Sequence, residues 1–211
     1  MIRSSELSAG IESERNIESS YQEEMASSFE DAVNKSIESY FFEKDRENSF
    51  ALVDIDGCLI EDNRIKIPFL SHRYEPVISD ENKEAFLNLV TAFNGSVAVI
   101  TNRGTKDNIV WNTGRVFSKV KNFLKSEELN LEIYKSLLRQ FPFIKRGDTE
   151  NFVEYLGQKV NQSKRGVLDI YSIEDWSIAS LNRGTFYRFV SKEIENRYGG
   201  VLRVKNFVVK R

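Results

Sequence analysis

FALVDIDG, residues 50–57, is the stretch that decides the fold of this chain of 211 residues. It is apolar without interruption up to Asp54, which is typical of a parallel strand covered on both faces. Asp54 and Asp56 stand two residues apart on extended backbone, so their carboxylates leave the same face, and Gly57 permits a sharp turn directly after them. Two carboxylates in one space repel each other unless a cation or a proton intervenes. The pattern therefore indicates metal binding or acid–base chemistry, with a plain polar turn as the alternative.

A second apolar run, Ser96–Thr101, also ends in polar residues, namely Asn102 and Arg103. Thr101 offers a hydroxyl, and the turn after it offers backbone N–H groups, which can hold phosphoryl oxygens. An ordinary turn between a strand and a helix is the alternative. In parallel sheets, ligands bind beyond the carboxyl ends of the strands, so this run and the first one predict one shared site.

The third apolar run, Gly166–Ile173, ends at Glu174 and Asp175. A hard cation held by oxygen ligands needs a carboxylate opposite the pair that follows the first strand, and Asp175 is the stronger candidate. Glu174 is either an acceptor behind the ligands or a residue on the opposite face of the strand.

Helical spacing of apolar residues fills the segments between these runs. Helices are expected over 79–93, 108–124, 127–141, 149–160 and 177–198, and a last strand over 201–209. Strands that alternate with helices predict an α/β fold, a Rossmann-like parallel sheet with helices on both faces. One domain should span 47–211, with a small flap at about 59–80.

The N-terminal part of the chain differs in composition and in the spacing of its apolar residues. Residues 1–18 are rich in Ser and Glu, and we expect them to be disordered. An amphipathic helix is predicted over 19–46, because apolar residues recur at every fourth position: Met25, Phe29, Val33, Ile37 and Phe41. The helix either packs on the following domain or binds a partner or a second copy of the chain.

Composition limits the classes of protein and partner. The chain has 30 basic and 32 acidic side chains, a net charge of −2, so bulk charge does not indicate nucleic acid. Cys58 is the single cysteine, which fits a reducing compartment. The sequence contains no run that is long and apolar enough for an export signal or a membrane span. We therefore expect a cytoplasmic protein with no membrane partner.

DIDGCLI at 54–60, VITNRG at 99–104, a lysine and SIEDWS at 172–177 follow one another along the chain. In this order they resemble the motifs of the haloacid dehalogenase (HAD) superfamily, and the resemblance runs from about residue 50 to the C-terminus. It implies a HAD-like catalytic domain of the small-cap type. The activity that it implies is that of a Mg²⁺-dependent phosphatase, a hydrolase of phosphomonoesters.

The resemblance also implies a role for each matched residue. Asp54 is the nucleophile that forms an aspartyl-phosphate, while Asp56 protonates the leaving oxygen and then activates water. Thr101 hydrogen-bonds the transferring phosphoryl group. Mg²⁺ is held by Asp54, the backbone carbonyl of Asp56 and Asp175.

Other positively charged and polar residues complete the expected site. Lys145, in FPFIKRGD, best matches the catalytic lysine of the third motif, and Lys159 and Lys164 are alternatives. Asn102 and Arg103 would help to bind an anionic substrate. The substrate is expected to be a phosphorylated small molecule or a larger phosphoester.

Two other classes of function stay open at this point. Response-regulator receivers also unite acids, Thr and Lys around Mg²⁺, but their acceptor lies in mid-chain. The second class is a phosphate-binding scaffold without catalysis, in which the segment Ser20–Asp45 engages a partner.

Overall fold

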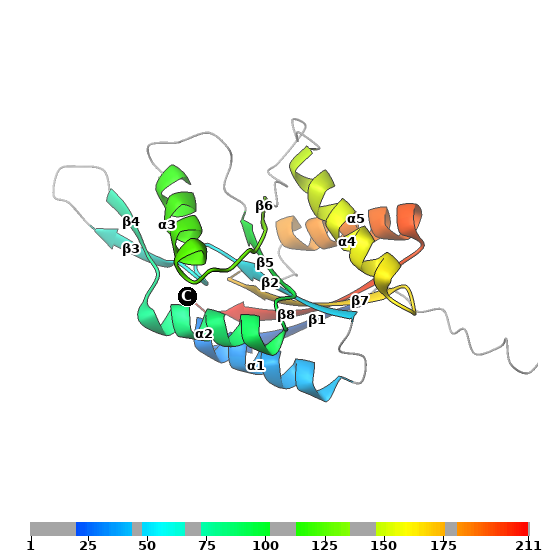
Figure 1. Ribbon diagram of the computed structural model, residues 1–211, viewed down its shortest axis with the longest axis horizontal. Helices are drawn as coiled ribbons and strands as arrows, with labels where there is room; N and C mark the ends of the chain where they lie inside the picture. The colour runs from blue at the N-terminus through cyan, green and yellow to red at the C-terminus, as the bar shows by residue number, and fades with distance from the viewer. Residues whose placement is uncertain are drawn as a thin grey trace, which may run out of the picture.

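The computed structural model describes residues 20–43, 48–65, 73–101, 113–135, 147–175 and 181–210. In these ranges the chain forms a six-stranded sheet, a separate two-stranded hairpin and five helices (Figure 1). The sheet strands are β1 (Ser20–Ala26), β2 (Ser49–Asp54), β5 (Val97–Thr101), β6 (Ile133–Lys135), β7 (Val167–Glu174) and β8 (Val201–Val209). The hairpin is β3 (Glu61–Ile65) with β4 (Arg73–Val77), and the helices are α1 (Phe29–Phe42), α2 (Asp80–Ala92), α3 (Thr113–Ser126), α4 (Gly147–Gln162) and α5 (Leu181–Tyr198).

The sheet has the order β1-β8-β7-β2-β5-β6, and each neighbouring pair is parallel. Apart from β1, the strands therefore follow the doubly wound order 3-2-1-4-5, with β2 in the centre. All six residues of β2 are buried. The direction of winding changes between β2 and β7, so the carboxyl ends of these two strands border the crevice where such sheets bind ligands.

Helices cover both faces of the sheet, as the sequence predicted for a Rossmann-like α/β fold. One apolar cluster joins β2 and β5 to α1, α2 and α3, and includes Val53, Phe86 and Phe123. A second cluster joins the opposite face to α4 and α5, and includes Leu52 and Phe152. Figure 1 shows α1 and α2 on one side of the strands and α4 and α5 on the other. Among the described helices, none combines the length and apolar character needed to cross a bilayer.

The three motif-bearing strands and the last strand were predicted correctly as β2, β5, β7 and β8. The predicted helices at 79–93 and 149–160 correspond to α2 and α4. Those at 108–124 and 177–198 correspond to α3 and α5, and their first residues lie outside the described ranges. Residues 1–18 also lie outside these ranges, while β3 and β4 pair within the segment proposed as a flap.

The single helix expected over 19–46 is wrong in its first part. Residues 20–26 form β1, which pairs with β8 in parallel register from Ser20↔Arg203 to Ala26↔Val209. The helix begins only at Phe29, where the Ser28 hydroxyl accepts a hydrogen bond from the backbone N–H of Asp31. A hydroxyl at this N-cap position satisfies a backbone donor that has no partner within the helix, which fixes the start of α1.

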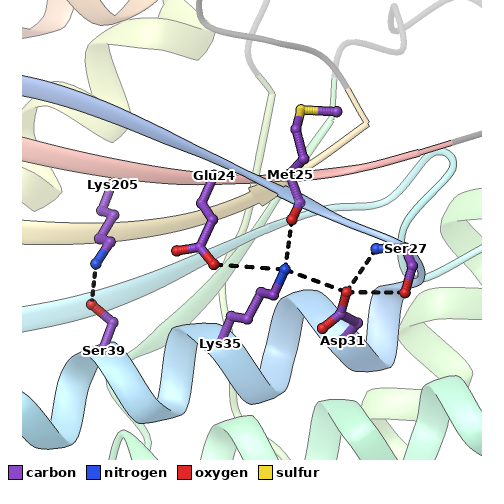
Figure 2. A network of polar contacts seen from close by, with 7 residues as sticks. All are labelled: Glu24, Met25, Ser27, Asp31, Lys35, Ser39 and Lys205. Atoms are coloured by element: carbon purple, nitrogen blue, oxygen red, sulfur yellow. Dashed lines mark hydrogen bonds and ion pairs between the residues drawn. The ribbon is translucent and has the colours of Figure 1, made fainter.

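A polar network joins β1 to α1 (Figure 2). Lys35 donates a hydrogen bond to the backbone oxygen of Met25 at 2.6 Å and forms ion pairs with Glu24 and Asp31. Asp31 accepts bonds from the backbone N–H and the hydroxyl of Ser27 at 2.7 and 3.0 Å. These bonds, the backbone one first, hold the pKa of Asp31 below its ordinary value, and Lys35 adds to the effect. Side chains of α1 thus fix the end of the edge strand.

The helix expected over 127–141 is also wrong where the structure describes it. Glu128 has a φ of 56°, which ends the helical path after α3, and residues 133–135 form β6 beside β5. Leu129, Leu131 and Ile133 are partly buried against the core. Their spacing of two residues is the alternation typical of a strand, and this signal was available in the sequence.

Candidate active site at the carboxyl edge of the sheet

The turn after β2 has a defined and unusual geometry. The N–H of Leu59 donates to the oxygen of Asp54 at 3.4 Å, and the N–H of Ile60 donates to the oxygen of Ile55 at 2.8 Å. Each bond spans five residues, which is the spacing of a π-type turn. Gly57 has a φ of +74°, a value that glycine adopts without steric strain. Asp56 therefore lies in a tightly bonded turn directly beyond the strand.

A side chain from α2 holds this turn in place. The amide nitrogen of Asn82 donates to the backbone oxygens of Cys58 at 3.0 Å and Leu59 at 3.4 Å. Asn82 is buried, so these bonds satisfy amide N–H donors that water does not reach. Sequence reasoning missed this residue, because a polar residue in the first turn of a helix gives no sign of what it contacts.

The structure brings together three of the predicted site residues. β2 pairs with β5 through Asp54↔Ile100, so Thr101 lies one residue beyond the position opposite Asp54. The Thr101 hydroxyl donates to Oδ2 of Asp56 at 3.3 Å. Asp54 and Thr101 are both buried, at 3% and 0% exposure. The predicted nucleophile, the predicted acid–base residue and the hydroxyl thus gather at two adjacent strand ends.

The fourth motif lies at the end of β7, on the other side of β2. The register pairs Val53 with Ile173, and Asp54 and Glu174 each follow by one residue. Because side chains alternate along strands, Asp54 shares its face with Leu52 and Glu174 shares its face with Ile170. Both apolar residues belong to the cluster covered by α4 and α5. Asp54 and Glu174 are therefore neighbours on one face of the sheet.

Glu174 is held by a buried cluster of hydroxyls. Its Oε1 accepts hydrogen bonds from the Ser172 hydroxyl at 2.6 Å and from the Tyr187 hydroxyl at 2.5 Å. The Ser172 and Tyr187 hydroxyls are 2.7 Å apart, and all three residues have 0% exposure. Of the two sequence readings of Glu174, an acceptor behind the site agrees with this geometry. Tyr187 was not predicted, because only the packing of α5 on β7 brings it to Glu174.

Asp175 directly follows β7, and both of its carboxylate oxygens are shielded from solvent. Among the described residues, no group of three or more His, Cys, Asp or Glu is placed to hold a metal ion. The predicted Mg²⁺ site does not require such a group, because its protein donors are two carboxylates and a backbone carbonyl. Mg²⁺ prefers oxygen donors and is commonly bound by one or two carboxylates with water and substrate phosphate. The donor types of Asp54, Asp56 and Asp175 fit this preference.

Three predicted site residues, Asn102, Arg103 and Lys145, lie outside the described residues. Of the alternative lysines, Lys159 is in the last turn of α4, and Lys164 lies between α4 and β7. This connection leads into the amino end of β7, at the opposite edge of the sheet from Asp54. Neither lysine is suited to the predicted role.

Comparisons of the chain with known protein families, with curated proteins and with solved structures give no significant match. The fold and the geometry of the carboxyl edge are therefore the grounds for any statement about function.

Proposed function

We propose that the protein is a Mg²⁺-dependent phosphomonoester hydrolase of the haloacid dehalogenase type, with Asp54 as its nucleophile. One observation carries the proposal. A buried aspartate ends the central strand at the change of winding, and Asp56 and Thr101 are hydrogen-bonded to each other directly beside it. This is the edge at which doubly wound sheets bind ligands.

In the proposed reaction, a carboxylate oxygen of Asp54 attacks phosphorus and the bond to the ester oxygen breaks. Asp56 donates a proton to the departing oxygen, which leaves as an alcohol. Asp56 then takes a proton from water, whose oxygen attacks the phosphorus of the aspartyl-phosphate. The bond to Asp54 breaks and inorganic phosphate is released. Without substrate the Thr101 hydroxyl donates to Asp56 at 3.3 Å, which supports the idea that both groups reach the same phosphoryl group.

Asp54, the carbonyl of Asp56 and Asp175 would hold Mg²⁺, which supplies positive charge to neutralise the phosphoryl oxygens. Thr101 would contribute a hydrogen bond to the same oxygens, and Asn102, Arg103 and Lys145 stay as predicted contacts. Glu174, fixed by Ser172 and Tyr187, lies beside Asp54. A cation at this edge would offset the repulsion between the carboxylates that hold it.

The order of the strands favours this proposal over a receiver-like signalling module. Receiver domains have the flavodoxin-like order 2-1-3-4-5, whereas β6-β5-β2-β7-β8 follows the order 3-2-1-4-5. Measurement of turnover distinguishes the enzyme from the alternative, a phosphate-binding scaffold without catalysis.

The test is hydrolysis of p-nitrophenyl phosphate by the full chain, with Mg²⁺ and with EDTA. Asp54→Asn should lower kcat by at least about a thousandfold, because the amide is a poor nucleophile. Glu38→Gln makes the same exchange of carboxylate for amide at an exposed position of α1 and should leave kcat unchanged. Comparable turnover in Asp54→Asn, or turnover that is equal in EDTA, would contradict the proposal.

The covalent intermediate gives a second readout. Acid quenching of the wild-type protein with ³²P-labelled substrate should leave label on the chain, and Asp56→Asn should retain it for longer because water is no longer activated. Label that persists without release of phosphate in the wild type would favour the receiver-like module. Bound phosphate with neither label nor turnover would favour the scaffold.

A further inference from the structure

A surface groove of about 360 Å³ lies between β6 and α4. Its polar lining comes from the two elements together: Glu132, Tyr134, Asn151, Glu154, Tyr155 and Gln158. The three residues Asn151, Glu154 and Gln158 are exposed and spaced by three and four positions, so they form one stripe along α4. Two carboxylates, two phenol hydroxyls and two carboxamides therefore converge on one space, and most of these groups can accept hydrogen bonds.

Tyr134 is the buried part of this lining. It is 9% exposed, and its ring packs against Phe152 and Tyr155 with centroids 5.2 and 5.3 Å apart. Within the described part of the chain, its hydroxyl makes no hydrogen bond, although the residue lines the groove. The side chain is thus almost entirely buried while its hydroxyl reaches the groove, where it can bond to a ligand.

The groove has a negative electrostatic character. Burial raises the pKa of the Tyr134 hydroxyl, and Tyr155 and Glu132 raise it further. Burial and then Glu132 also raise the pKa of Tyr155, which places the Glu132 charge near both phenols. A cation from the same helix, the ammonium of Lys159, lies 5.6 Å from the centre of the Tyr155 ring. This ring thus already contacts one cation.

We propose that this groove binds an organic cation that carries N–H donors, namely a guanidinium or a primary ammonium. Such a group can donate to Glu132, Glu154 and the Tyr134 hydroxyl at once, and charge-assisted bonds of this kind are the stronger ones. The same chemistry is offered by a small amine or by the arginine or lysine side chain of a protein partner.

None of Asp54, Asp56, Thr101 and Asp175 lines the groove, and binding there does not depend on the proposed phosphatase activity. Tyr134 pairs with Ile100, and Ile100 pairs with Asp54. Tyr134 therefore lies two strand spacings, roughly 10 Å, from the proposed nucleophile. Occupation of the groove can be measured in a protein that has no catalytic activity.

The experiment titrates the full-length ¹⁵N-labelled protein at low salt with two matched pairs of probes. Ethylguanidinium is compared with its neutral analogue ethylurea, and Nα-acetyl-arginine amide with Nα-acetyl-citrulline amide. We expect saturable shifts of backbone amide signals in residues 132–134 and 151–158 with the cations, and an affinity for the neutral analogues that is weaker by at least about tenfold. Tighter binding of the arginine amide than of ethylguanidinium identifies a protein side chain as the source, and equal binding identifies a small cation.

Three variants test the named contacts. Glu132→Gln and Glu154→Gln should each weaken cation binding by about tenfold, and Tyr134→Phe should weaken it without unfolding the ring cluster. Glu127→Gln removes the same charge from an exposed residue outside the groove and should have no effect. The proposal is overturned if citrulline and arginine amides bind equally, if neither Glu132→Gln nor Glu154→Gln weakens binding, or if no saturable shift occurs.

Discussion

β2 and β1 are parallel strands of the same sheet, but they are stabilised in different ways. β2 lies between β5 and β7, and every residue of it is buried. β1 has the single neighbour β8, and most of its side chains are exposed, including Met25 at 45%. The backbone of β1 is nevertheless paired along all of Ser20–Ala26.

The comparison teaches that a strand in this sheet can arise from two sources. For β2 the main source is the removal of apolar side chains from water. For β1 it is the backbone ladder to β8 together with the polar contacts of Lys35 and Asp31, which Figure 2 shows. Tyr21 adds a link to α5, because its hydroxyl bonds to the backbone oxygen of Tyr187 and to Ser191. The four predictions below test this difference, from the largest expected effect to the smallest.

The largest contrast is expected from truncation of one side chain in each strand. Leu52→Ala in β2 should lower the free energy of unfolding by about 2–5 kcal/mol, because it leaves a cavity in a fully buried position. Gln22→Ala in β1 should change it by less than about 0.5 kcal/mol, because the side chain is exposed. Urea denaturation with a common slope measures both. A similar loss in both variants would show that β1 contributes to the core as β2 does.

Removal of a tyrosine hydroxyl makes a matched comparison. Tyr187→Phe should cost about 1–3 kcal/mol, because Glu174 and Ser172 lose a buried hydrogen-bond partner. Tyr21→Phe removes a partly buried hydroxyl and should cost about 0.5–1.5 kcal/mol. If the hydrolysis proposed above is observed, Tyr187→Phe should also lower kcat, whereas Tyr21→Phe should not. Equal losses of stability would contradict the idea that the buried hydroxyl at Glu174 contributes more to stability than the hydroxyl of Tyr21.

The contribution of the network in Figure 2 is tested by Lys35→Met, which keeps the length of the side chain but removes its charge. The free energy of unfolding should fall by up to about 1 kcal/mol, because Lys35 is partly exposed. Amide hydrogen exchange in residues 21–26 should accelerate more than exchange in β2. Unchanged exchange in β1 would mean that the ladder to β8 is sufficient without Lys35.

The smallest expected effect is a dependence on pH through Asp31. Its pKa is lowered in the folded protein, first by the backbone N–H of Ser27, so its stabilisation is present above the ordinary value of 3.8 and is lost as pH falls through the folded pKa. The difference in stability between the wild type and Asp31→Asn should therefore shrink as pH falls from about 5 to about 3. A difference that stays constant over this window would show that the carboxylate charge is not responsible.

The sequence predicted the central part of the fold well. Phe50 to Asp54 and the runs that end at Thr101 and Glu174 are strands, because short, mostly apolar runs that end in polar residues are typical of strands covered on both faces. The segments that failed, 20–26 and 133–135, form the two edge strands of the sheet. Most side chains of residues 20–26 are exposed, so this sequence is weakly constrained and a helical spacing of apolar residues can arise there by chance. Before residues 133–135 the alternation of Leu129, Leu131 and Ile133 was the strand signal, and the prediction of a helix overlooked it.

The candidate site also contains residues that the sequence predicted and residues that it did not. From residues alone, Asp54, Asp56, Thr101 and Asp175 could be assigned to strand ends, and the polar turn after a buried strand was the signal. The contacts of Asn82 and Tyr187 could not be predicted, because each depends on how a distant helix packs on the turn or on β7.

By itself, the sequence determined which segments are buried strands and which acidic residues follow them, because burial imposes a pattern that is local along the chain. Only the tertiary structure decided that Glu174 shares a face with Asp54, that Tyr187 reaches Glu174, and that Tyr134 lines a groove with Glu132 and Glu154. These facts depend on strand register and helix packing. Both are set by contacts between residues far apart in the sequence, which no local pattern records.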